Sequence, residues 1–168
     1  MTTKKSIAIL FGILVISAWV LGSAIQVRAE TLNYKGYTWT VKLERVPISD
    51  VEGHTVSLLL QKGFSVFENG EVATNTSVVT SDLINLSGPF MLYVTINFQD
   101  GSTIVYKSRG TRGGSAVGWT SEIIKGTGRF EGIKGTQSGK YKYLPVETGE
   151  VGPKSYGEGT LTYTLPKK

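Results

Sequence analysis

The segment Gly126–Leu144, GTGRFEGIKGTQSGKYKYL, decides the fold of this chain, because it places four glycines within residues 126–135. Such a segment can be a phosphate-binding loop, a flexible linker or a tight corner between strands. The glycines at 126, 128 and 132 are spaced one residue too widely for the G-x-G-x-x-G pattern of dinucleotide-binding loops. Residues Lys140–Leu144 then alternate as a strand does, whereas that pattern requires a following helix. The phosphate-binding interpretation therefore lacks its structural context.

The same segment also contains large apolar residues that a linker rarely carries. Phe130 and Ile133 are spaced so that both can be buried. Glycine supplies the positive φ angles and the close backbone approach that a sharp turn between strands needs. The segment is therefore predicted to be a corner in which Phe130 and Ile133 fill one end of a β fold. This predicted glycine corner consists of Gly126, Gly128, Phe130, Gly132 and Gly135.

The rest of the chain is typical of an all-β protein. Its apolar segments are short, rich in β-branched and aromatic residues, and separated by glycine or Asx turns, without a helical period. About eight strands in one domain favour a closed barrel, because closure leaves no exposed sheet edge. The expected strands are Trp39–Leu43, His54–Phe67, Val72–Leu83, Phe90–Phe98, Thr103–Arg109, Trp119–Lys125, Lys140–Leu144 and Gly159–Leu165.

Two of these strands allow a prediction at the level of single residues. In the first, Trp39, Val41 and Leu43 alternate with polar residues and are expected to form one half-buried face. In the hairpin around Asp100, a three-residue loop places Ile96 opposite Ile104 and also matches the neighbouring apolar pair Val94 and Tyr106. A two-residue turn would place Val94 opposite a lysine instead. Since a slip of one residue moves a whole face, burial favours the three-residue loop.

The N-terminus has the pattern of a secretory signal peptide. Two lysines precede an uncharged segment, residues 6–26, and Val27-Arg28-Ala29 follows, so cleavage is predicted after Ala29, with Ala24 as the second choice. The expected organisation is a signal peptide, residues 1–29, and a single barrel domain, residues 30–168, in a bacterial periplasmic or secreted protein. The alternative is an inner-membrane anchor, because Ile7–Ala24 just reaches the length that spans a bilayer.

Composition excludes several classes of function. Without the signal, 15 basic residues stand against 13 acidic ones, and a net charge of +2 is a poor match for a nucleic-acid backbone. The chain has no cysteine, which excludes cysteine nucleophiles, redox pairs and cysteine-based zinc sites. It has one histidine, His54, so a histidine-rich metal site is also excluded. No metal, no cofactor and no nucleic-acid partner are expected. The chain is expected to contact a membrane only if its signal segment stays uncleaved.

The glycine corner also carries a resemblance. Gly126–Gly132, GTGRFEG, followed by Gly135 and a strand of tyrosines and lysines, resembles the GGSGIFEG-x-x-G stretch of plant allene oxide cyclases, with a looser relative in dirigent proteins. Phe98–Thr103, FQDGST, is similar to the aromatic-DGS segment of a central strand in the same proteins. The chain therefore resembles the allene oxide cyclase-like, dirigent-like β-barrel superfamily. It departs from the plant pattern at Lys125, where those enzymes have glycine.

This resemblance implies an eight-stranded antiparallel barrel with a hydrophobic lumen, often a trimer, that works without a cofactor. The chain is accordingly expected to bind a small hydrophobic molecule in its lumen or to act as a scaffold, rather than to be an enzyme. The first alternative is a cofactor-free cyclase or isomerase, and the second is a structural or partner-binding barrel. Two or more buried polar side chains that converge on an open cavity would favour the enzyme, and a filled lumen the structural role.

Candidate site residues follow from chemistry and position, each beside a simpler structural explanation. His54 could act as a general base and Glu131 as a lumen carboxylate, although a histidine at a strand start and a glutamate in a glycine corner more often have a structural role. The aromatic residues could line a ligand pocket or simply fill the core and rim of the barrel. They are Trp39, Tyr93, Tyr106 and Trp119, together with Tyr141 and Tyr143.

Two connecting segments have a distinctive composition. Arg109–Ser115 is basic and rich in glycine, so it is predicted to be a mobile loop, with an anion-binding nest of backbone amides as the alternative. Pro145–Ser155 is longer than an ordinary hairpin loop and contains two prolines. It is predicted to be a mobile flap over one mouth of the barrel.

Overall fold

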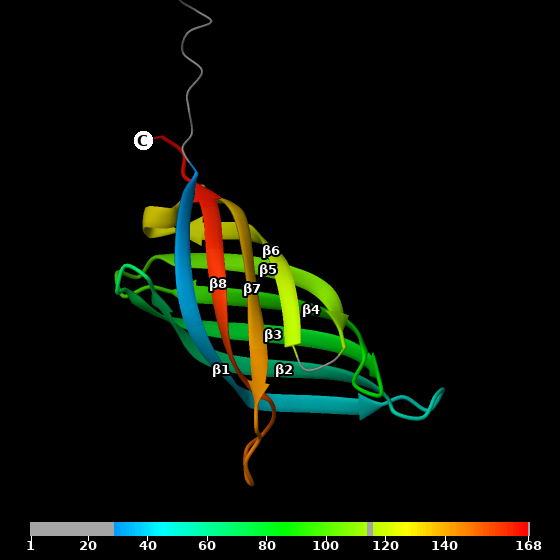
Figure 1. Cartoon of the computed structure of the whole chain (residues 1–168). Coiled ribbons are helices and arrows are strands. Elements are labelled where there is room, and N and C mark those ends of the chain that lie inside the picture. The colour runs from blue at the N-terminus through cyan, green and yellow to red at the C-terminus, as the bar shows by residue number, and fades with distance from the viewer. Residues whose placement is uncertain (1–28, 114–115, 168) are drawn as a thin grey trace, which may run out of the picture.

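The computed structural model describes residues 29–113 and 116–167 and forms a closed antiparallel barrel of eight strands (Figure 1). Each strand pairs with its neighbours in chain order, and β1 closes the barrel against β8. This confirms the predicted fold class. The strands are β1 (Glu30–Pro47), β2 (His54–Phe67), β3 (Val72–Ile84), β4 (Gly88–Asn97), β5 (Thr103–Arg112), β6 (Ala116–Thr127), β7 (Lys134–Leu144) and β8 (Lys154–Thr164).

The predicted signal peptide lies outside the described residues, except for its last residue. In the part of the chain that the structure describes, no helix has the length and apolar character needed to cross a membrane. The one helical element described is η1 (Gly128–Phe130), a single 3₁₀ turn between β6 and β7.

The β4–β5 hairpin has the predicted register. Ile96 pairs with Ile104, and Val94 pairs with Tyr106. Phe98 N donates to the carbonyl oxygen of Ser102 at 3.0 Å, which closes the three-residue loop. Gly101 in that loop has a φ of 81°, a conformation that glycine adopts without strain.

The prediction that Trp39 shares a half-buried face with Leu43 is wrong. Trp39 is exposed on the outside of the barrel, whereas Thr40 is buried inside it. The register against β2 shifts between Thr40 and Lys42, so that a bulge at Val41 returns Leu43 to the inside, opposite Leu59. A bulge adds one residue to a strand and reverses the alternation beyond it, and simple apolar periodicity does not show this.

The glycine corner is confirmed. Phe130 is only 4% exposed and lies at one end of the barrel within η1. Gly126 allows the chain to turn back on itself, because a Cβ at this position would lie 2.1 Å from the carbonyl oxygen of Phe130. Gly128 and Gly132 have φ angles of 63° and 73°, in the region that favours glycine.

The apolar core fills the half of the barrel next to this corner. Phe98 links the aromatic part of the core, because its ring centroid lies 5.4 Å from that of Phe67 and 4.8 Å from that of Phe130. The most deeply buried aliphatic side chains are Ile96, Ile104 and Leu161. We call this part of the lumen the closed half, and the part towards the β7–β8 connection the open half.

Candidate functional site

The open half of the lumen contains a cavity of about 130 Å³ that all eight strands line. Its walls are largely aliphatic and aromatic. Its aliphatic lining includes Leu59, Val79 and Leu92, and its aromatic lining includes Phe90, Tyr106 and Trp119. The cavity therefore begins where the packed core of the closed half ends.

Glycines on β7 and β8 make room for the large rings that reach into this lumen. A Cβ at Gly159 would lie 2.4 Å from the ring of Tyr34, and one at Gly139 would lie 2.8 Å from the indole of Trp119. Large side chains on one strand thus face missing side chains on the next, which is how a small barrel fits its interior. These glycines fix the positions of Tyr34 and Trp119 without filling the cavity.

A buried amide joins the polar groups at the floor of the cavity. Gln137 is completely buried, and its Oε1 accepts hydrogen bonds from Trp119 Nε1 at 2.6 Å and Ser121 Oγ at 2.9 Å. Its Nε2 donates to the Tyr34 hydroxyl at 2.8 Å. The Ser121 hydroxyl also contacts that of Ser108. A buried network in which each member has partners orients its side chains rigidly.

The floor of the cavity is uncharged at neutral pH. Burial raises the pKa of Tyr34 to about 12. Burial also raises the pKa of Tyr106 well above its usual value, and the neighbouring Tyr34 adds to this effect. Both phenols therefore remain neutral and bring no negative charge to the cavity.

One buried polar atom in the lining is without a partner. Asn75 Nδ2 donates to Ser65 Oγ at 3.4 Å, but Asn75 Oδ1 has no hydrogen-bond partner within the described ranges. It lies above Gly63, where a Cβ would come within 2.6 Å of it. The absence of that side chain is what leaves space for the amide.

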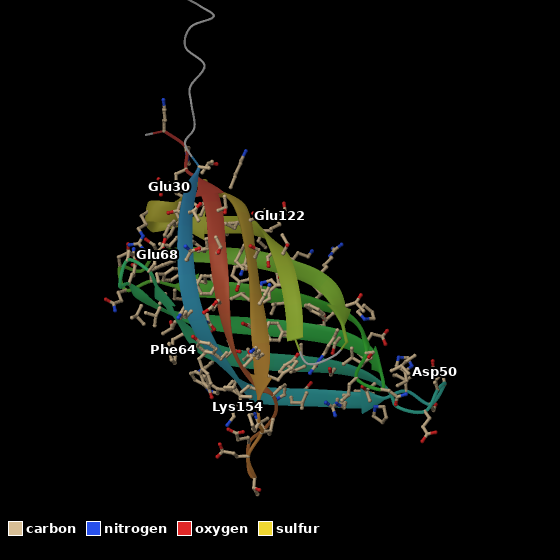
Figure 2. The ribbon with its side chains drawn as sticks, viewed as in Figure 1. Glu30, Asp50, Phe64, Glu68, Glu122 and Lys154 are labelled. Carbon is tan, nitrogen blue, oxygen red and sulfur yellow. The ribbon has the colours of Figure 1, made fainter. Side chains whose placement is uncertain are left out.

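The mouth of the cavity lies where β5 ends and β8 begins. The Arg112 guanidinium lies 4.7 Å from the centre of the Tyr143 ring, and both side chains line the cavity. The β7–β8 connection is held beside them, because Thr40 Oγ1 donates to the carbonyl oxygen of Pro153 at 2.6 Å. Lys154 lies at the base of this connection (Figure 2), and its Nζ is 2.7 Å from an oxygen of Glu150. The β7–β8 connection therefore lies beside the mouth of the cavity. Its mobility stays a prediction.

The structure separates the aromatic candidates into two groups. Tyr106 and Trp119 line the cavity, as do Tyr141 and Tyr143. Trp39 and Tyr93 are exposed, at 38% and 36%, on the outer face of the barrel and have no part in the lining.

The two catalytic candidates also lie outside the cavity lining. Glu131 is exposed at the end of η1, beside the closed half. His54 lies at the start of β2, where Nδ1 is 2.5 Å from an Asp50 oxygen and Nε2 is 2.6 Å from an Asp82 oxygen. Figure 2 shows Asp50 on the projecting β1–β2 connection, away from Lys154. The two contacts of His54 thus join the β1–β2 connection to β3.

The sequence did not indicate Tyr34 or Gln137 as lining or floor residues. It predicted Arg112 in a mobile loop, whereas Arg112 ends strand β5 and lines the cavity. Tyr34 precedes the strand that was expected from the sequence, although the observed β1 begins at Glu30. Gln137 and Arg112 are polar residues at inward positions, and a polar residue on a strand normally indicates the outer face. In the sequence, Gly135 and Gly139 stand two residues before and after Gln137, and this spacing was the one sign that Gln137 points inward. Within the described ranges, no three histidine or acidic side chains are grouped so that they could hold a metal ion.

The sequence matches no protein-family model and no curated protein. Solved structures do resemble it. Two pterocarpan synthase dirigent proteins superpose with a TM-score of 0.52, at 15% and 16% identity, over 83% and 88% of this chain and 97% and 96% of theirs. A pyocyanin demethylase superposes with a TM-score of 0.48, at 13% identity, over 82% of this chain and 100% of its own.

The likeness to the two dirigent proteins shows that the chain has a dirigent-like barrel fold. The glycine corner and the aromatic-DGS segment therefore indicated the correct fold. In this dirigent-like barrel the identity to the solved structures is low, so the likeness concerns the fold, and function has to be argued from the cavity itself.

Proposed function

We propose that this dirigent-like barrel binds a small, largely apolar molecule in the open half of its lumen. The observation that supports this is the cavity, which has aliphatic and aromatic walls and a few placed polar groups, beside a half that is fully packed. Ligand pockets in proteins generally have this composition. That two solved barrels of this fold are named pterocarpan synthases further supports a small organic ligand.

The volume of the cavity limits the size of the ligand. An engineered cavity of about 150 Å³ in another protein binds benzene. At about 130 Å³, the cavity accommodates one aromatic ring or an aliphatic body of similar size. A larger ligand would extend from the mouth towards the β7–β8 connection.

Tryptophan fluorescence tests this proposal. Trp119 lines the cavity and Trp39 is on the outer face, so Trp39→Phe leaves Trp119 as the reporter of the described barrel. We expect phenylpropyl probes to change its emission saturably. Ser77→Phe fills the cavity and should abolish the change, whereas Thr80→Phe, on the outer face of the same strand, should retain it. Unchanged emission in Trp39→Phe, with no small molecule retained on purification, would contradict binding in the lumen.

A second candidate function is a cofactor-free isomerase or cyclase. It is favoured by the buried polar side chains that converge on the open cavity, the criterion stated from the sequence. Neutral phenols of Tyr34 and Tyr106 could stabilise a negative charge that develops on a ligand oxygen. Within the described residues, however, the lining contains no aspartate, glutamate or histidine that could act as a base. Tyr34→Phe should then lower turnover while binding persists, and binding without turnover in the parent protein would favour the first proposal.

A further inference from the structure

We propose that the cavity selects an organic monoanion, a carboxylate with an apolar body of about one ring, and that Arg112 at the mouth binds its charged group. This inference rests on the proposed function and specifies the chemical class of the ligand.

The first observation is the charge of the lining. Among the described residues that line the cavity, Arg112 is the only charged side chain. An arginine remains protonated at any physiological pH. The field inside the lumen is therefore set by one positive charge at the mouth, above a neutral floor.

The second observation is that this positive charge is not paired. Arg129 provides a contrast, because this half-exposed arginine is paired. It lies 2.6 Å from an oxygen of Glu71 and 3.3 Å from one of Asp100. Within the described residues, Arg112 forms neither an ion pair nor a side-chain hydrogen bond, and it is positioned by the face of the Tyr143 ring. Stacking on a ring occupies the face of the guanidinium and leaves the N–H groups at its edge free for a planar carboxylate.

The third observation is the direction of Arg112 on its strand. The inward positions of β5 are 104, 106, 108, 110 and 112, and Arg112 pairs with Gly88, which offers no side chain to displace it. Arg109 lies on the same strand at an exposed outward position. The chain thus provides two arginines three residues apart, one of which faces the cavity.

Charge and solvation determine how the ligand is oriented. A carboxylate loses less hydration at an open mouth than at a buried floor, and a ring gains more from the dry aromatic walls. The ligand therefore enters with its apolar end first. A single arginine compensates a single negative charge, which favours a carboxylate over a doubly charged phosphate monoester.

Three matched probes test the inference: 3-phenylpropanoate, 3-phenylpropan-1-ol and 3-phenylpropylamine, titrated against Trp39→Phe protein. We expect the carboxylate to bind about tenfold more tightly than the alcohol, because it gains a charge-assisted hydrogen-bonded pair. The amine should bind most weakly. Higher salt should weaken only the carboxylate, since salt screens an ion pair at an open mouth.

The arginines provide the variants. Arg112→Gln should reduce the preference for the carboxylate to about twofold or less while alcohol binding is retained, and Arg112→Lys should retain part of the preference. Arg109→Gln removes the same charge from the outer face and should leave all three affinities unchanged. Equal affinity for carboxylate and alcohol in the parent protein would overturn the inference but leave the proposed function intact. If none of the probes binds, both are overturned.

Discussion

The closed and open halves of this barrel are built from the same strands but have opposite interiors. On β5, the inward residue is Ile104 in the closed half and Arg112 at the open mouth. On β3, Ala73 is buried in the core, whereas Ser77 and Ser81 line the cavity. Along β3 and β5 the alternation continues without interruption, and only the size and polarity of the inward side chain change. One half thus supplies the stability of the fold, and the other half is free to hold a ligand.

The largest effect is expected in the closed half. Phe130→Ala should reduce the free energy of unfolding by about 3–5 kcal/mol, because it removes a buried ring from the aromatic part of the core. Phe64→Ala is the matched control, since Phe64 is 42% exposed on the outer face, and its loss should be clearly smaller. Chemical denaturation measures both. A loss below about 1 kcal/mol for Phe130→Ala would show that the closed half does not carry the stability.

A smaller effect is expected at the boundary between the halves. Gln137→Leu keeps the volume but leaves Tyr34 and Trp119 without their shared partner, so it should cost about 1–3 kcal/mol in the free energy of unfolding. Ser138→Ala, at the exposed neighbouring position, should change it little. Equal stability of the two variants would mean that the buried network is not needed to hold the rings of the cavity in place.

Comparison with the sequence shows why the closed half was easier to predict than the open half. Apolar alternation identifies buried positions, so the pairing of Ile96 with Ile104 and the burial of Phe130 were correct. The prediction for Trp39 was wrong because a bulge at Val41 reverses the alternation of the strand. The pattern of apolar residues in the sequence does not reveal a bulge. Inward polar residues such as Gln137 have the same appearance in a sequence as outward ones. The cavity is lined in part by such residues, so it could not be identified from the sequence alone.

A pH-dependent effect is expected at the rim, outside the cavity. The hydrogen bonds of His54 with Asp50 and Asp82 raise the pKa of the imidazole. Stability from this contact is complete below the unfolded value of about 6.5, and it is lost as the pH rises through the higher folded-state pKa. The thermal midpoint of the parent protein should fall more between about pH 6 and pH 9 than that of His54→Gln. Parallel pH profiles would contradict this role, and altered probe binding by His54→Gln would place His54 in the site.

The smallest effect on stability is expected at the β7–β8 connection. Replacing both Glu147 and Glu150 by glutamine removes the ion pairs with Lys154, and pairs near the surface contribute little to stability. The thermal midpoint should stay almost constant, while hydrogen exchange in the connection and the rate of probe release should both increase. Glu44→Gln, which breaks the exposed pair with Lys42, is the control and should leave release unchanged. An unchanged release rate in the double variant would contradict the flap.

Isotope-filtered NMR of a bound phenylpropyl probe tests most directly whether a ligand occupies the open half of the lumen. We predict nuclear Overhauser effects from the ring of the probe to the methyl groups of Leu59, Val79 and Leu92, which line the cavity. The methyl groups of Ile104 and Leu161, buried in the closed half, should show none. Contacts to the closed half, or only to methyl groups on the outer face of the barrel, would contradict the account.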